Sequence, residues 1–160
     1  MEITDVSVAD AGQIADIYRH SVEDSIVSFE ESAPDATEMA KRIESPERRH
    51  WIVAKEEGRV LGYAYATEFR ARAAYRFTAE STIYVAPERQ RRGVARALVT
   101  ELHRRLADEG IHTVVSVIAL PNPASVALAG DLGYEYVGTL PEAGFKLGQW
   151  IDVGIWALRL

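Results

Sequence analysis

Hydrophobic and polar positions follow two different periods along this chain, and each change of period marks a predicted element. An arginine-rich segment carries an apolar residue at every fourth position, and these residues are Val94, Leu98, Leu102 and Leu106. That spacing predicts a helix with one buried face, which runs to about residue 107 and stops at Gly110. Residues 113–119 are a continuous β-branched apolar run, which predicts a strand buried on both faces.

Shorter patterns predict the other elements. The predicted strands are residues 2–8, 50–55, 60–68, 77–85 and 113–119, with two more after Gly133 that run to residue 160. The predicted helices are residues 10–20, capped by Asp10, then 36–43, 94–107 and 125–132. The order β-α-α-β-β-β-α-β-α-β-β combines hairpins with one or two crossovers. It favours an α/β fold: a mixed sheet of about seven strands, flanked on both faces by about four helices.

Composition narrows the class of protein. A chain of 160 residues without linker-like segments or repeats predicts one domain over residues 1–160. No apolar run is long enough for a membrane helix, and the first five residues do not resemble a signal peptide. We therefore expect a cytoplasmic protein without a membrane partner.

Charge and side-chain chemistry exclude further classes. The net charge of −6 argues against a nucleic-acid partner, because such binding needs a basic surface. The chain has no cysteine, so disulfides, thiolate metal sites and a cysteine nucleophile are all excluded. The four histidines lack ligand-like spacing, so we expect no metal site and assign them structural roles.

The segment from Tyr84 to Arg96 holds the strongest functional signal. It reads as a strand that ends at Pro87, a short loop, and a helix start crowded with arginine. A helix N-terminus already carries partial positive charge and unpaired N–H groups, so added arginines are unfavourable unless an anion is bound there. Gly93 lets the backbone approach such an anion. The pattern lacks the glycines of a Walker loop or a dinucleotide fingerprint, and the alternative reading is a solvated helix start.

The spacing Gln90-x-x-Gly93-x-Ala95 resembles the Q/R-x-x-G-x-G/A loop of the GCN5-related N-acetyltransferases (GNAT), which binds the pyrophosphate of acetyl-coenzyme A. A second family signature, N-x-x-A/S-x-x-x-Y-x-x-x-G-F/Y, is matched at all but one position by Asn122, Ser125, Gly133 and Tyr134. Residues 69–85, 120–122 and 144–153 look like the phosphinothricin and methionine-sulfoximine acetyltransferase branch. The resemblance implies the GNAT acyl-CoA N-acyltransferase fold and an acetyl-CoA-dependent N-acetyltransferase (EC 2.3.1) that acts on a small amino-acid-like amine.

The resemblance also implies a set of site residues. Glu80 corresponds to the candidate general base. The cosubstrate acetyl-CoA is expected to contact Ile83, Tyr84, Val85, Gln90, Arg91, Arg92, Gly93, Val94, Ala95, Arg96, Asn122 and Ser125. The acceptor pocket is expected to draw on Phe29, Glu30, Arg72, Tyr75, Lys146 and Trp150. In this branch some pocket residues come from a second subunit, so a homodimer is expected.

The chemistry of amide formation agrees with these roles. The absence of cysteine excludes an acyl-cysteine intermediate and favours direct attack of the amine on the thioester, and a carboxylate such as Glu80 is suited to accept the amine proton. Arg72 and Lys146 suit the carboxylate or phosphinate of an acceptor. Alternative readings remain: Glu80 as a surface carboxylate, Tyr75 and Trp150 as packing aromatics, and Asn122 as a helix cap.

Two rival functions and one departure from the family pattern stay open. The rivals are acetylation of a protein N-terminus or polyamine, and a non-catalytic acetyl-CoA-binding module. Many family members carry Tyr, and this branch often His, seven residues after Asn122, as a possible acid for the leaving thiolate. Here that position is Ala129. Either the acid is dispensable, or another group such as Tyr134 or a water replaces it.

Overall fold

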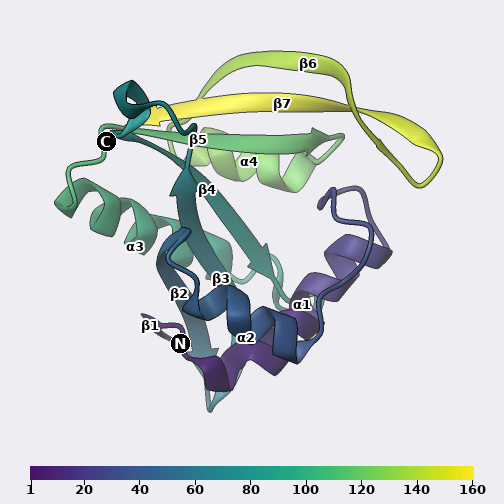
Figure 1. The fold of residues 1–160 in the computed structure, drawn as a ribbon, viewed down its shortest axis with the longest axis vertical. Helices are drawn as coiled ribbons and strands as arrows, with labels where there is room; N and C mark the ends of the chain where they lie inside the picture. The colour runs from purple at the N-terminus through teal and green to yellow at the C-terminus, as the bar shows by residue number, and fades with distance from the viewer.

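A seven-stranded mixed sheet forms the centre of the computed structural model, which describes all 160 residues (Figure 1). The strands are β1 (Glu2–Asp5), β2 (Arg48–Glu56), β3 (Arg59–Glu68), β4 (Thr78–Val85), β5 (Thr113–Leu120), β6 (Glu135–Lys146) and β7 (Gln149–Arg159). The helices are α1 (Ala11–Glu23), α2 (Ala36–Glu44), α3 (Val94–Asp108) and α4 (Pro123–Asp131). Three short 3-10 helices, η1 (Val8–Asp10), η2 (Ala73–Tyr75) and η3 (Pro87–Arg89), complete the elements. None of the helices is long and apolar enough to cross a membrane.

The strand order is β1-β2-β3-β4-β5-β7-β6, and only β4 and β5 run parallel. The predicted order of elements and the mixed sheet are therefore confirmed. Strands β2 and β3 form one of the expected hairpins: Glu57 and Gly58 both have positive φ, as a tight two-residue turn requires. The first strand is shorter than predicted, because the Ser7 N–H and hydroxyl bind the Asp10 carboxylate and start η1.

Each face of the sheet buries its own hydrophobic core. One core joins the apolar stripe of α3 and residues of α4 to inward-facing side chains of the central strands. All four residues of that stripe are buried, as its four-residue spacing predicted. The other core joins α1 and α2 to the opposite face, where Trp51, Tyr63 and Tyr84 pack together. Alternate residues of β4 thus face opposite cores, which decides where its functional side chains point.

The pairing of β4 with β5 breaks off partway along both strands. Register pairs run only from Thr78–Thr113 to Glu80–Val115, and beyond them the two strands spread apart (Figure 1). The prediction that residues 113–119 are buried on both faces is accordingly wrong in one place. Val117 is 41% exposed, because it lies beyond the last β4–β5 pair and faces the opening between the strands.

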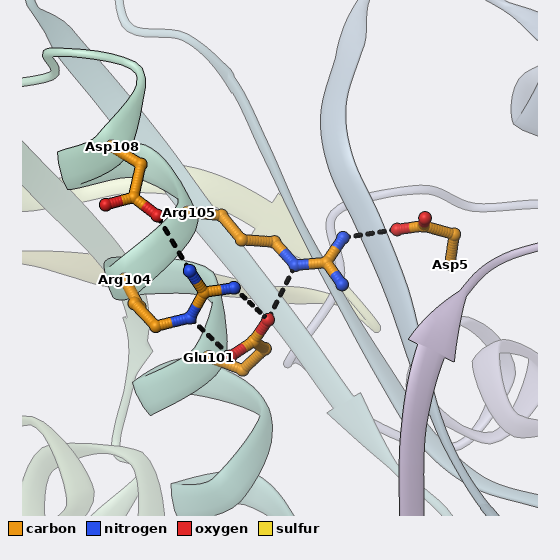
Figure 2. Close-up of polar contacts among 5 residues, drawn as sticks. All are labelled: Asp5, Glu101, Arg104, Arg105 and Asp108. Carbon is orange, nitrogen blue, oxygen red and sulfur yellow. Dashed lines mark hydrogen bonds and ion pairs between the residues drawn. The ribbon is translucent and has the colours of Figure 1, made fainter.

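Ion pairs on the surface hold the outer strand β1 against α3. The Arg105 guanidinium contacts both Glu101, one turn earlier in α3, and Asp5 at the end of β1, while Arg104 contacts Glu101 and Asp108 (Figure 2). These charge-assisted bonds lower the pKa of Glu101 to about 2. Exposed pairs of this kind each contribute roughly 0.2–1 kcal/mol, so the network supports β1 without dominating stability.

Candidate active site at the fork between two strands

A cleft of about 260 Å³ fills the fork where β4 and β5 separate. Its walls come from the diverging halves of β4 and β5 and from one face of α4. Residues 27–29, in the loop between α1 and α2, also line it. Because the strands lose each other's hydrogen bonds here, their backbone N–H and C=O groups face the opening. Such an edge can bind an extended polar chain as an added strand would.

Glu80 lies at the point where the fork begins. It belongs to the last register pair with β5 and is half-buried, with no ion pair or side-chain hydrogen bond. Its neighbour Ala79 belongs to the α3 core, so Glu80 projects toward the face covered by α1 and α2. Burial raises the pKa of Glu80 above its ordinary value. A carboxylate in this environment is a stronger base than an exposed one, as proton abstraction from an amine requires.

Ser81 and Tyr134 line the opposite side of the same point. The Tyr134 hydroxyl lies 2.7 Å from His103 Nε2 and 3.4 Å from Ser81 Oγ. Burial raises the pKa of Tyr134 to about 12 and lowers the pKa of His103 to about 4, so both are neutral near pH 7. The cleft therefore has a carboxylate on one face and a neutral hydroxyl on the other.

Of the residues expected to bind the cosubstrate along β4 and α4, all but Val85 line the cleft. Ile83 and Val85 pack toward the α3 core and Tyr84 toward Tyr18, so these three residues offer the fork their backbone. Asn122 caps α4, because its side chain accepts a hydrogen bond from Ser125 N–H at 3.1 Å. Both Asn122 and Ser125 line the cleft, so the capping role and a ligand-binding role are compatible.

The arginine-rich loop presents a row of free donors at the start of α3. No backbone N–H from Arg91 to Arg96 donates a hydrogen bond within the protein. Arg91 and Gly93 have φ values of 59° and 80°, and no atom lies within 4 Å of the place where a Gly93 Cβ would stand. Gln90 and Arg92 are exposed on the same loop, while Val94 is buried and starts the helix. Free N–H groups beside open space at a helix N-terminus fit a phosphate group.

The arginines themselves fall into two kinds. Arg91 and Arg92 make no ion pair, whereas Arg89 contacts Glu56 at 3.7 Å and Arg96 contacts Asp131 of α4 at 2.7 Å. Arg96 therefore ties α3 to α4 in addition to its expected position beside the cosubstrate. Ala95 is half-buried in the first turn of α3.

The loop between α1 and α2 forms a roof over the cleft, held by Lys146. The buried Lys146 ammonium donates to the backbone carbonyls of Ser28 and Ser21. The Phe29 ring lies over Gly144, where an added Cβ would stand 2.4 Å from ring atoms. Phe29 lines the cleft, as expected of an acceptor-binding residue. Lys146 does not line the cleft and acts on it only indirectly, by binding the backbone of the loop that does.

Glu30 lies in the same loop and binds α1 and α2. Its carboxylate accepts two hydrogen bonds from Arg42, at 2.8 and 3.0 Å, and one from the Tyr18 hydroxyl at 2.8 Å. Burial raises the pKa of Glu30, but the bonds from Arg42 and Tyr18 outweigh it and leave that pKa below its ordinary value. The side chain holds α2 against the roof and is not among the groups that line the cleft.

Besides Glu30 and Lys146, three further residues expected at the acceptor pocket lie outside the cleft within this chain. Arg72 and Tyr75 belong to the exposed loop between β3 and β4, which borders a separate small hollow of about 40 Å³. Trp150 is 63% exposed beside Phe145, near the tip of the β6–β7 hairpin. The chain by itself does not bring these three residues to Glu80.

Two residues of the site were absent from the sequence prediction. Ser81 follows Glu80, so strand alternation alone places it on the other face, where it reaches the same point of the fork. His103 carried no such signal, because its partner Tyr134 is separated from it by 31 residues and the β5 and α4 elements. Only the packing of α3 against the segment after α4 brings them together.

Comparison with known proteins gives consistent similarities. The profile of the Acetyltransferase (GNAT) family matches residues 14–134. Phosphinothricin N-acetyltransferase of Streptomyces viridochromogenes is 42% identical over 157 residues, covering 98% of this chain and 86% of that protein. The L-methionine sulfoximine/L-methionine sulfone acetyltransferase of Pseudomonas aeruginosa is 30% identical over 99% of this chain and 94% of its own length. A crystal structure of a phosphinothricin acetyltransferase from Sinorhizobium meliloti in complex with acetyl-CoA has a TM-score of 0.93 at 38% identity. That match covers 99% of this chain and 88% of the other.

Proposed function

Since this chain belongs to the GNAT family and is an acetyl-CoA-dependent N-acetyltransferase, we propose that its acceptor is the amine of a small amino-acid-like molecule, of the phosphinothricin or methionine-sulfoximine type. The observation that carries the proposal is the half-buried, unpaired Glu80 where the fork begins, in a cleft that the Phe29 ring also lines. A cleft of about 260 Å³ that also receives the end of acetyl-CoA suits a small acceptor better than a long polyamine.

The reaction follows from the arrangement of the two strands. Acetyl-CoA supplies the activated acetyl group as a thioester, and the unpaired backbone of residues 83–85 and the free donors of residues 91–96 support their proposed role in holding it. Glu80 accepts the amine proton, and the amine nitrogen forms a bond to the acetyl carbon as the carbon–sulfur bond breaks. With no cysteine in the chain, positioning of amine against thioester supplies much of the rate.

A panel of amines tests the acceptor class. Thiol release from acetyl-CoA would be followed with phosphinothricin, methionine sulfoximine and sulfone, ordinary amino acids, polyamines and an N-terminal peptide. We expect kcat/KM to be highest for the two amino-acid analogues. Preference for the peptide or the polyamine would contradict the proposed acceptor. Tight acetyl-CoA binding without turnover of any amine would instead support a binding module.

Gly93→Ala tests the proposed acetyl-CoA contact. An alanine at position 93 must adopt the left-handed backbone conformation of Gly93, which costs about 1–2 kcal/mol of stability. Its methyl group enters the open space beside the free N–H groups. We expect the Kd for CoA, measured by calorimetry, to rise about tenfold, the equivalent of one lost hydrogen bond to a charged group. Gly110→Ala is the matched control, because Gly110 has φ of 90° and equally open surroundings at the other end of α3. Equal affinities in the two variants would contradict the role of Gly93.

We further propose that two copies associate through the β6 edge. The outer edge of β6 is unpaired, and the β6–β7 hairpin exposes Val137, Leu140, Phe145, Leu147 and Trp150 by 52–63% each. A long apolar edge strand is prone to pair, and two identical strands pair antiparallel about a two-fold axis. Such a dimer offers a route by which Arg72, Tyr75 and Trp150 of one copy reach the site of the other.

Sedimentation analysis tests the dimer. The parent protein is expected to be a dimer at micromolar concentration, and Val137→Lys is expected to make it a monomer, because the new charge would be buried at the edge. Val8→Lys, at a 47% exposed position in η1, is expected to leave the dimer intact. A monomeric parent would refute the proposal.

A further inference from the structure

A chain of three polar side chains lies at the base of the cleft, on the sheet face opposite Glu80. His103 Nε2 is 2.7 Å from the Tyr134 hydroxyl, which is 3.4 Å from Ser81 Oγ. Ser81 and Tyr134 line the cleft, while His103 stands behind them on α3. Tyr134 is otherwise surrounded by the apolar α3 core. A hydroxyl held this way inside an apolar cluster has its orientation fixed by its partners.

The fold leaves Tyr134 as the ionisable group on this side of the fork. The titratable side chains lining the cleft are Glu80, Tyr84 and Tyr134, and the first two project toward the α1–α2 face. The α4 position beside Tyr134 is Ala129, whose methyl group lines the cleft and cannot donate a proton. Tyr134 N–H is bonded to the Ala129 carbonyl at 3.0 Å, so the tyrosine backbone is fixed to the end of α4.

We propose that the Tyr134 hydroxyl donates a hydrogen bond to the sulfur of the departing CoA, and that His103 is the residue that positions it. The inference rests on the proposed acetyl transfer. As the carbon–sulfur bond breaks, its electron pair goes to sulfur, and the hydrogen bond from Tyr134 stabilises the thiolate, which takes up a proton from solvent as CoA leaves. Tyr134 keeps its own proton, and the amine proton goes to Glu80 on the other face.

His103 suits this role because it stays neutral. Burial lowers the pKa of His103 to about 4, so the ring carries one N–H near pH 7. With that hydrogen on Nε2, His103 donates to the Tyr134 oxygen, and the hydrogen of Tyr134 is left to point toward Ser81 and the cleft. A donor on its oxygen also strengthens the hydrogen bond that the Tyr134 hydroxyl itself donates.

Titration of the thiol of bound CoA tests the contact without any acceptor. A free thiol has a pKa near about 8.5, and a hydrogen bond from Tyr134 to the thiolate lowers that value. We expect the thiol of CoA, followed by thiolate absorbance, to titrate about one pH unit lower when bound to the parent than when bound to Tyr134→Phe. Tyr136→Phe is the control, since it removes an exposed hydroxyl bonded to Thr139 outside the cleft. Equal thiol pKa values in the parent and Tyr134→Phe would overturn the proposal.

Steady-state kinetics distinguish a catalytic role of Tyr134 and a positioning role of His103 from mere packing. Tyr134→Phe is expected to lower kcat about tenfold with the KM for acetyl-CoA unchanged. His103→Leu is expected to do the same, and His103→Gln, which keeps a donor, is expected to recover most of the loss. Equal losses in His103→Leu and His103→Gln would show that His103 only packs. Failure of CoA to bind the parent would refute the proposed function itself, whereas binding with an unshifted thiol would refute only the role of Tyr134.

Discussion

Replacing Glu80 with Gln is expected to lower kcat/KM for the acceptor about 10²–10³-fold at pH 7, the usual contribution of a positioned general base. Gln has nearly the shape of Glu, so the half-buried position where the fork begins stays filled. An amide, however, cannot accept the amine proton. The KM for acetyl-CoA should stay unchanged, because Glu80 precedes the open backbone of β4 that is proposed to hold the cosubstrate.

The pH dependence gives this prediction a sharper form. Burial raises the pKa of Glu80, which makes its carboxylate a stronger base toward the amine proton. In Glu80→Gln only the acceptor molecules that are already neutral can react, so the rate should climb with pH until the amine itself titrates. The difference from the parent should therefore shrink as the pH approaches the amine pKa. Rates would be measured from pH 6 to 10 with phosphinothricin as acceptor.

Glu44→Gln provides the control for charge alone. Glu44 is exposed at the end of α2 and lies outside the cleft, so its substitution removes the same charge without touching the site. Parent-like activity of Glu80→Gln at pH 7 would show that the carboxylate is not the base. A loss of equal size at every pH would point to positioning of the substrate instead of proton transfer.

Replacing Asp10 with Ala is expected to lower the free energy of unfolding by about 3 kcal/mol, the low end of the cost of breaking a buried ion pair. The Asp10 side chain is only 6% exposed and lies 2.7 Å from the Lys55 ammonium of β2. It also accepts hydrogen bonds from the Ser7 N–H and hydroxyl. The substitution leaves Lys55 and the Ser7 N–H without their partner where the first helix joins the sheet. For a chain of this size we expect the Tm to fall by about 10 °C.

Acid should remove the difference between Asp10→Ala and the parent. Burial raises the pKa of Asp10, but the hydrogen bond and charge of Lys55, together with Ser7, outweigh it and leave the pKa below the ordinary 3.8. A lowered folded-state pKa stabilises the protein fully above the ordinary pKa, and the contribution is lost as the pH falls through the folded value. Denaturant unfolding of the parent and of Asp10→Ala, at pH 7 and below pH 4, would measure the difference in free energy of unfolding under each condition.

Asp16→Ala is the matched control for stability. It makes the same substitution within α1 at a side chain that is 72% exposed and whose contact with Arg19 is 3.4 Å long. We expect a change within about 0.5 kcal/mol, as for most exposed positions. If Asp10→Ala were no more destabilising than Asp16→Ala, the buried pair would not be an important tie between α1 and β2.

Local sequence patterns were sufficient to predict the helices and strands and part of the candidate site. The four-residue stripe of α3, the hairpin turn at Glu57 and Gly58, and the free donors before Val94 all depend on neighbours within a few residues. Such features follow from backbone periodicity and from the missing side chain of glycine, so a sequence displays them directly. The family motifs placed Glu80, Asn122 and Ser125, and the structure puts all three at one cleft.

Long-range packing decided the rest. The sequence shows a continuous apolar run at residues 113–119, but only the separation of β4 and β5 exposes Val117 and opens the cleft. Lys146 reads as a free cation, yet the fold turns it toward the carbonyls of Ser28 and Ser21, 118 and 125 residues away. His103 likewise acquires its partner Tyr134 only when α3 packs beside the end of α4. The sequence by itself determined the order of elements, the candidate anion-binding loop and the candidate base, because each is encoded by residues close together in the chain. Which polar groups remain free to meet a substrate was decided by the tertiary structure, because a side chain's partners come from elements distant in the chain.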